Sequence, residues 1–190
     1  MSVIDDPGSA FDLTVPVVVI GGGACGLVAA LSAHDNGAEV IVLERDPVPK
    51  GSTALSSGMI TACGTALQKA ADIDDDTAEL FARDIQSKAG GKADPHLLAA
   101  ICAGSGPAID WLIECHNMDL VLVDGPPYPG HSRQRTHAPP TNSGADLMAD
   151  LLRAVDAAHI DVICNATVKE LIVDGDKVSG VVITRPDGSS

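Results

Sequence analysis

The chain has 190 residues, of which 45% are hydrophobic and 2% aromatic, and its formal net charge is −14 at pH 7. This length fits one domain or part of a larger one, with a core built mainly from aliphatic side chains. The acidic balance argues against nucleic acid and anionic membranes as partners and favours a solvated acidic surface. No apolar run is expected to be long enough to span a membrane, and the N-terminus lacks the pattern of a secretory signal.

The five cysteines are scattered along the chain. None forms CxxC, and none has zinc-ligand spacing with a histidine. We therefore expect reduced, mostly buried thiols, no metal site and a cytoplasmic location. Residues 1–15 are expected to form a flexible acidic leader, and residues 16–190 to form one domain.

A nucleotide-binding pattern follows the leader. The β-branched run Val17–Ile20 precedes a glycine-rich turn at 21–26, a helix that ends near Gly37, and an apolar strand at Val40–Leu43 with Glu44 at its end. In this order the elements form the βαβ dinucleotide fingerprint, in which a tight bend links a central strand to a helix.

Each part of the fingerprint has a separate physical role. Gly21 permits a sharp turn, Gly23 lets a pyrophosphate approach the backbone, and Gly26 lets the helix pack on the strands. The helix N-terminus offers free N–H groups and a positive dipole end to the diphosphate. Glu44 follows at about the spacing of 20 residues that places a carboxylate on ribose hydroxyls, and it would repel the 2′-phosphate of NADP. An NAD-binding dehydrogenase domain and a βαβ unit without nucleotide remain the alternatives.

A second loop, at residues 51–60, is rich in glycine and small hydroxyl residues. Ser52 and Thr53 offer O–H and N–H donors to a diphosphate, and Ser57 and Gly58 offer backbone groups to a ring edge.

Two helical regions follow near 76–88 and 95–116. The acidic run 74–76 suits the start of the first, and Pro95 suits the first turn of the second.

Breaks and short strands are expected in the remainder of the chain. Residues 104–107, Gly-Ser-Gly-Pro, are expected to divide the second helical region into two helices. A short strand is predicted at 120–123 and a long irregular segment at 125–144. A helix near 145–158 precedes strands at 161–164 and 167–173. Asp174-Gly175 then forms a tight turn to a hairpin partner at 178–184.

These elements predict an α/β, Rossmann-like fold: a parallel sheet flanked by helices, with a β-hairpin near the C-terminus. Only three strands precede the hairpin, so the sheet is truncated relative to a complete doubly wound fold. Such a domain would leave apolar sheet exposed, which favours association.

The motifs at 21–44 and 51–60, with looser segments at 68–70, 108–112 and 130–137, resemble the flavoproteins of the fumarate reductase and succinate dehydrogenase family and their ketosteroid dehydrogenase relatives. The resemblance runs from about Val15 to Ile183. It implies FAD as the cofactor and a fold in which 16–190 form the N-terminal part of the FAD-binding domain. It also implies hydride transfer between flavin N5 and an activated C=C bond of an acid or ketone substrate.

The resemblance assigns the 21–26 turn to the diphosphate, Glu44 to the ribose, the backbone of Val168 to adenine, and Ser57 to Met59 to the isoalloxazine. Because Ser52 stands where some members carry a flavin-linked histidine, we expect noncovalent FAD. The full cofactor-binding set is Gly21, Gly23, Ala24, Cys25, Gly26, Glu44, Arg45, Ser52, Thr53, Ser57, Gly58, Met59 and Val168. No catalytic residue is assigned. In members of the family, the capping domain and the catalytic groups follow the part that this chain resembles.

Two departures from the family pattern stand out. Met59 replaces a glycine near the expected flavin plane, and the segment from Arg135 to Gly144 lacks part of the family's basic pattern. His131, Arg133, Arg135 and His137 form either an anion site or, as we favour, basic groups on a surface loop. A non-catalytic nucleotide-binding module remains an alternative to the enzyme.

Overall fold

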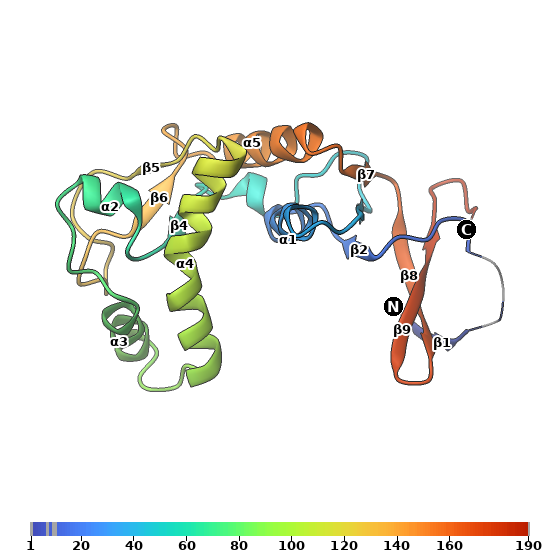
Figure 1. The fold of residues 1–190 in the computed structure, drawn as a ribbon, viewed down its shortest axis with the longest axis horizontal. Coiled ribbons are helices and arrows are strands. Elements are labelled where there is room, and N and C mark those ends of the chain that lie inside the picture. The colour runs from blue at the N-terminus through green and yellow to red at the C-terminus, as the bar shows by residue number, and fades with distance from the viewer. Residues whose placement is uncertain (1, 7, 9–10, 190) are drawn as a thin grey trace. The chain divides into compact units, whose positions relative to one another are not determined.

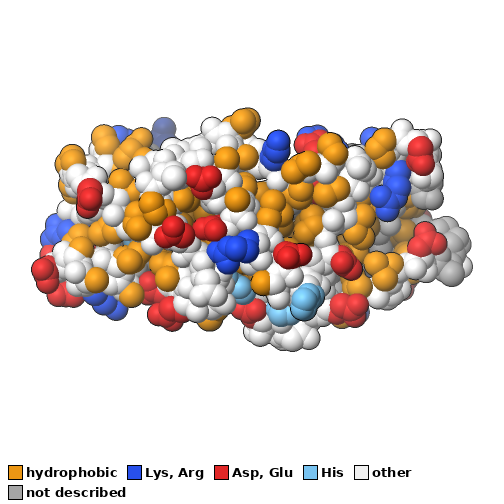
Figure 2. Space-filling view, turned by 90° about the horizontal axis from the view of Figure 1, so that it is seen from above, with side chains coloured by type: hydrophobic (Ala, Val, Ile, Leu, Met, Phe, Trp, Pro, Cys, Tyr) orange, Lys and Arg blue, Asp and Glu red, His pale blue; other side chains and the backbone are white. Residues whose placement is uncertain are grey.

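The computed structural model describes residues 2–6, 8 and 11–189. The chain divides into two compact units, Met1–Thr53 with Leu151–Ser190, and Ala54–Asp150. Figure 1 gives the labels of the helices and strands within each unit. The space-filling view shows acidic side chains scattered among apolar ones on the face drawn (Figure 2), which agrees with the expected solvated acidic surface.

A parallel sheet carries the first unit. β2 (Val17–Ile20), β3 (Val40–Leu43) and β7 (Asp161–Ile163) lie in the order β2-β3-β7. α1 (Ala24–Asp35) connects β2 to β3 and buries Leu27, Ala30 and Leu31 completely. The predicted βαβ unit is thus confirmed, but β3 rather than β2 is the central strand. The reason is that β7, more than 100 residues later, pairs with β3.

A hairpin of β8 (Thr167–Asp174) and β9 (Lys177–Thr184) forms the second sheet of this unit. Gly175 has a φ of +62°, a conformation that glycine adopts without steric cost. β1 (Ser2–Asp5) pairs in parallel with β8, so the expectation of a flexible leader is wrong for these residues. The free edge of β8 offers backbone partners that the leader's own sequence does not reveal.

The second unit contains a short antiparallel sheet with the order β4-β6-β5. Its strands are β4 (Ile60–Thr61), β5 (Val121–Leu122) and β6 (Thr136–Ala138). All three residues of β6 are buried, so the expectation of an irregular segment over 125–144 is wrong here. Three residues reading Thr-His-Ala carry no apolar alternation, and pairing on both edges makes them a strand.

Side-chain caps start most helices of the second unit. η1 (Thr53–Leu55) is a 3-10 turn, and α2 (Ala66–Ala70) begins in a capping box of Thr65 and Gln68. α3 (Ala78–Lys88) is capped by Thr77, and α4 (Pro95–His116) by Asp94. α5 (Gly144–Ala157) begins in the second unit and ends in the first. The predicted helix positions are confirmed, although Asp76 turns inward instead of starting α3.

α4 is a single helix of 22 residues with Pro107 inside it, so the expected break at 104–107 is wrong. The tertiary contact explains why. A Cβ on Gly106 would lie 2.2 Å from the carbonyl oxygen of Cys63, so only glycine lets α4 approach that backbone. Ser105 Oγ accepts a hydrogen bond from the Cys63 amide at 3.3 Å beside this contact. Packing against Cys63 and α3 therefore stabilises a helix whose local sequence disfavours it.

The length and composition of α4 also match those of a membrane-crossing helix, with 28% of its apolar window buried in the protein. The expectation that no apolar run is long enough is wrong for this helix.

Of the five cysteines, Cys63 and Cys102 are buried with Phe81 and Leu98 in one cluster. Cys25 and Cys115 are exposed, so the expectation that most of the thiols are buried is wrong.

We predict that Gly106→Ala lowers the free energy of unfolding by about 1–3 kcal/mol, because the added methyl group overlaps the Cys63 carbonyl. Urea unfolding measures this. Gly104→Ala is the matched control, because nothing lies within 4 Å of a Cβ there. It should be neutral or raise stability by up to about 1 kcal/mol from helix propensity. Equal effects of the two substitutions would contradict this explanation of α4.

Candidate functional site: a glycine bend and a buried carboxylate

The bend between β2 and α1 depends on two close backbone approaches. Gly21 has a φ of +105°, and its amide donates to the Leu43 carbonyl at 2.8 Å. A Cβ on Gly26 would lie 1.9 Å from the Gly21 carbonyl oxygen and 3.2 Å from Val19 Cγ1. Gly26 therefore lets the first turn of α1 pack against the bend and β2, as its place in the fingerprint predicts.

The N-terminus of α1 is open to an anion. Gly23 is the N-cap residue, with φ −78° and ψ 177°, and it has no side chain to cap the helix. A Cβ at Gly23 would meet only Thr53 Oγ1, at 4.0 Å. The Thr53 hydroxyl accepts a long hydrogen bond of 3.4 Å from the Ala24 amide. A first turn whose N-cap is glycine, with only this long bond from another loop, suits a diphosphate.

Glu44 is bound directly to the bend. Its Oε2 accepts a hydrogen bond from the Gly22 amide at 2.7 Å, and its Oε1 accepts one from the Asp46 amide at 2.8 Å. The residue is 8% exposed. A carboxylate has about four acceptor positions, so two remain for hydroxyl donors such as those of a ribose. Glu44 thus holds the bend in shape and keeps acceptor capacity for a ligand.

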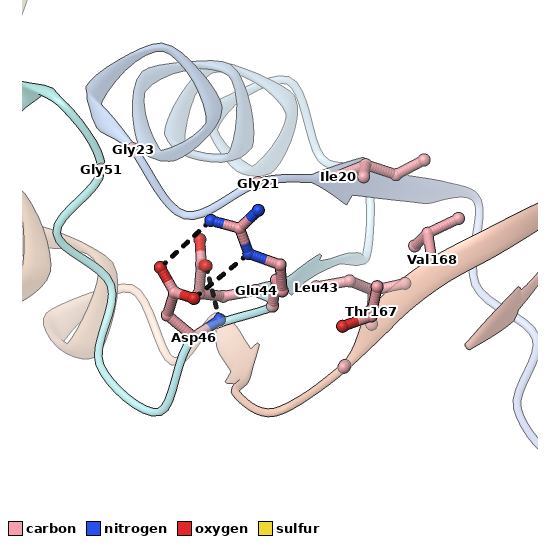
Figure 3. A pocket seen from close by; sticks show the side chains of 11 residues that line it. Ile20, Gly21, Gly23, Leu43, Glu44, Asp46, Gly51, Thr167 and Val168 are labelled. Atoms are coloured by element: carbon pink, nitrogen blue, oxygen red, sulfur yellow. Dashed lines mark hydrogen bonds and ion pairs between the residues drawn. The ribbon is translucent and has the colours of Figure 1, made fainter. Parts of the chain in front are cut away.

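These groups line one pocket of about 400 Å³ (Figure 3). Its lining comes from the bend, from the end of β3 with Glu44, and from the start of β8 with Val168. Arg45 also lines the pocket, and its Nε pairs with Asp46 at 3.1 Å. The lining residues are Ile20, Gly21, Gly23, Leu43, Glu44, Arg45, Asp46, Gly51, Ala166, Thr167 and Val168.

Five residues of the predicted cofactor-binding set line this pocket: Gly21, Gly23, Glu44, Arg45 and Val168. Ala24, Cys25 and Gly26 form the adjoining first turn of α1. Ser52 and Thr53 belong to the same unit as the pocket. Ser57, Gly58 and Met59 belong to the second unit, where a Cβ on Gly58 would lie 2.9 Å from the Ser143 carbonyl oxygen. Their assignment to the isoalloxazine remains a prediction.

Sequence reasoning missed several residues of the bend and the pocket. In the bend, Gly22 was not singled out, yet its amide binds Glu44. Gly51 was noted only as part of its loop, although a Cβ there would lie 3.4 Å from Gly23 Cα. The sequence signal for Gly51 is its place in a turn after two prolines, and in the structure its φ is +54°. Asp46 and Thr167 carry no such signal, because each reaches the pocket only through the packing of β3 and β8.

Two of the four basic residues of the 131–137 segment do not lie on a surface loop, because Arg135 and His137 are fully buried. His131 is half-buried, and Arg133 is partly exposed and pairs with Asp75. Arg135 Nε donates to Asp76 Oδ2 at 2.8 Å, its Nη1 to Asp84 at 2.5 Å, and its guanidinium lies 4.7 Å from the Phe81 ring centre. The Asp76 and Asp84 carboxylates neutralise the charge of Arg135, so the alternative that this residue forms an anion site is also wrong.

The surroundings of His137 and Asp84 determine the protonation states of these two side chains. Burial lowers the pKa of His137. As a neutral ring, His137 donates from Nδ1 to the Arg135 carbonyl at 2.9 Å and accepts at Nε2 from Thr65 at 3.0 Å. Burial raises the pKa of Asp84, but hydrogen bonds from Ser132 and Arg135 outweigh it and lower the pKa to about 2.

Comparison with known proteins gives a family. Residues 16–190 match the family model described as FAD binding domain. The chain is 36% identical over 167 residues to the NADH:fumarate oxidoreductase of Klebsiella pneumoniae (strain 342), a match that covers 87% of this chain and 18% of that protein. The chain therefore spans less than a fifth of the length of this relative.

Two solved structures have a similar fold. The open conformation of a flavocytochrome c3 fumarate reductase has a TM-score of 0.83 and 30% identity, and covers 92% of this chain and 31% of its own. The 3-ketosteroid-Δ4-(5α)-dehydrogenase of Rhodococcus jostii RHA1 has a TM-score of 0.80 and 25% identity, and covers 98% and 45%. The Rossmann-like FAD-binding fold expected from the motifs is confirmed.

We predict that the free energy of unfolding falls by about 2 kcal/mol as the pH drops from about 4 to about 2. The folded pKa of Asp84, about 2, lies below its ordinary value of 3.8. Its stabilising effect is therefore complete above pH 3.8 and is lost as the pH falls through about 2. Urea unfolding at a series of pH values measures this. Asp84→Asn should flatten the profile in this range, whereas Asp119→Asn, at an exposed position, should not.

Proposed function

Because the chain belongs to the family of FAD binding domains, we propose that it forms the FAD-binding part of a flavin-dependent oxidoreductase. The reaction we propose is hydride transfer between flavin N5 and an activated C–C or C=C bond of a carboxylic acid or ketone. FAD, when bound, supplies a carrier that exchanges a hydride at N5. The protein supplies binding, orientation and electrostatics.

The observation that carries this proposal is the meeting of a helix N-terminus and a buried carboxylate at one pocket. The first turn of α1, with glycine at its N-cap, suits the negative diphosphate, and Glu44 suits ribose hydroxyls. Backbone groups of Val168, which lines the same pocket, suit the adenine edge. A carboxylate next to an anion-binding turn fits an adenine dinucleotide, which has both ribose hydroxyls and a diphosphate, better than a free phosphate.

Other residues are assigned supporting roles in the proposal. Ser52 and Thr53 contact the diphosphate, and Arg45 lies beside the adenosine. Ser57, Gly58 and Met59 are assigned to the isoalloxazine. Ser52 in place of a flavin-linked histidine implies noncovalent binding. No residue of this chain is assigned to proton transfer.

The substrate class is inferred from two of the relatives. One is a fumarate oxidoreductase and another a ketosteroid dehydrogenase, and both names describe compounds with a carbon–carbon bond next to a carbonyl group. The partners proposed are therefore FAD and a small unsaturated acid or ketone. The net charge of −14 supports the proposal that nucleic acid and anionic membranes are not partners, and we propose a cytoplasmic location from the scattered cysteines. A non-catalytic FAD-binding module is the second candidate, because no residue of these 190 is assigned to proton transfer.

We predict that Gly23→Val raises the FAD dissociation constant at least about 100-fold, or about 2.7 kcal/mol, while the protein stays folded. The φ of −78° at Gly23 tolerates a side chain, and the space around it is open. The new side chain would therefore occupy the room proposed for the diphosphate. Titration followed by flavin fluorescence measures affinity, and urea unfolding checks the fold. Gly104→Ala is the control. Undiminished FAD affinity in Gly23→Val would refute the assigned diphosphate position.

We predict that Glu44→Gln weakens FAD binding about tenfold or more and lowers the free energy of unfolding by about 1–3 kcal/mol. The amide group of Gln would direct N–H donors at either the Gly22 or the Asp46 amide, where Glu44 accepts from both. Glu39→Gln removes the same charge at an exposed position in the same unit and should leave both quantities unchanged.

An activity assay separates the two candidate functions. The purified chain, loaded with FAD, is given a reduced viologen dye and fumarate. Turnover by these 190 residues would eliminate the non-catalytic module. FAD binding without turnover supports the module for the isolated chain. Tighter binding of NADH than of FAD would overturn both in favour of an NAD-binding domain.

A further inference from the structure

We propose that the N-terminal strap, defined as Ser2–Asp6 together with Phe11, is a positioning element for the adenine-side wall of the cofactor pocket. The proposal rests on the proposed function of the pocket. It adds a part of the chain that lies outside residues 16–190, the segment that the family model matches. The strap contacts the β8–β9 hairpin in two independent ways.

The first contact is a strand pairing. β1 pairs in parallel with β8, with Ser2 opposite Glu170 and Asp5 opposite Val173, and lies beside the hairpin in Figure 1. The Asp6 amide extends the ladder by donating to the Val173 carbonyl at 2.9 Å. β8 is therefore the middle strand of the sheet β1-β8-β9. A two-stranded hairpin alone is marginally stable in water, and a third strand stabilises it.

The second contact is an aromatic ring that occupies the space of a missing side chain. A Cβ on Gly180 would lie 2.5 Å from Phe11 Cε1 and 3.0 Å from Phe11 Cζ. Glycine inside a strand is normally unfavourable and marks a place where another group approaches closely. Here the group is Phe11, so the strap and the hairpin have complementary shapes.

The register of the sheet joins the two contacts. Ile4 pairs with Ile172, and Ile172 pairs with Gly180. Residues directly opposite one another in a ladder direct their side chains to the same face. Ile172 is 5% exposed, although it lies in a small sheet with few strands. The strap thus covers one apolar row that crosses all three strands.

This row lies on the strand that forms a wall of the pocket. β8 begins at Thr167, and Thr167 and Val168 line the pocket. The Ala166 amide donates to the Glu44 carbonyl at 2.8 Å, which fixes the start of β8 to the end of β3. Beyond that point the hairpin is held by the strap. Phe11 and Ile4 therefore act on the cofactor through β8, as positioning residues.

Hydrogen exchange and FAD titration of the full chain test the proposal. In Phe11→Ala, amides of β8 and β9 should exchange at least about tenfold faster, while amides of β3 keep their wild-type rates. The FAD dissociation constant should rise about tenfold, equivalent to about 1.4 kcal/mol. Leu13→Ala is the matched control, because Leu13 is 56% and Phe11 42% exposed in the same part of the chain, but the ring beside Gly180 is that of Phe11. A general loss of stability would instead raise exchange in β3 as well.

A double substitution gives a sharper test. Gly180→Ala should speed hairpin exchange in the wild-type chain, because the new methyl group displaces the Phe11 ring. In the Phe11→Ala background the same substitution should slow exchange or leave it unchanged, because alanine suits a strand better than glycine. The sign of the effect therefore depends on Phe11.

The outcomes separate the strap from the proposed function. If Phe11→Ala matches Leu13→Ala in exchange, or Gly180→Ala acts equally in both backgrounds, the strap is refuted. If exchange rises but the FAD dissociation constant stays the same, the positioning role is refuted. If wild-type protein fails to bind FAD while the exchange results hold, the proposed function is wrong and the contact of strap and hairpin stands.

Discussion

The hydrogen bond between the Glu44 carboxylate and the Gly22 amide, 2.7 Å long, is the constraint on which the site depends. It connects the end of β3 to the bend after β2, two points separated by 22 residues in the chain. A bend built from three consecutive glycines has a large conformational entropy to lose on folding. A buried carboxylate that binds the middle glycine offsets that loss. The bend is then ordered before any ligand arrives.

This arrangement gives one residue two physical roles. Glu44 orders the anion-binding turn through its bonds to backbone amides, and it keeps acceptor positions directed at the pocket. Preorganised sites bind more tightly because less ordering remains for the ligand to bring about. The negative charge of Glu44 also lies next to the region proposed for a negative diphosphate. The open N-terminus of α1 supplies the opposing positive end of a helix dipole.

Buried charge in the second unit has a different use. The Arg135 guanidinium is fully buried, and Asp76 and Asp84 neutralise it from two positions along the chain. A buried charge without partners would be strongly destabilising. Its bonds therefore hold the segment before α3, α3 itself and β6 together. Arg135, which the sequence places in a basic loop, is in the folded unit a buried charge bound by two carboxylates.

The sequence by itself determined the parts whose signals are local. Val17–Ile20, the bend and Glu44 follow one another in a single βαβ unit, so their spacing predicted both the structure and the carboxylate at the bend. The turn at Asp174-Gly175 likewise predicted the hairpin from adjacent residues. Helix caps such as Asp94 set helix starts within a residue or two, because a cap satisfies amides of the next turn.

Only the tertiary structure decided the features that depend on distant partners. α4 continues through Gly106 and Pro107 because the Cys63 backbone packs against it. β6 is a buried strand because both its edges are paired, and β1 is a strand because β8 has a free edge. In each case the local residues favour another conformation or none. The contacts that override them join residues between 15 and 168 positions apart, pairings that no local pattern in the chain encodes.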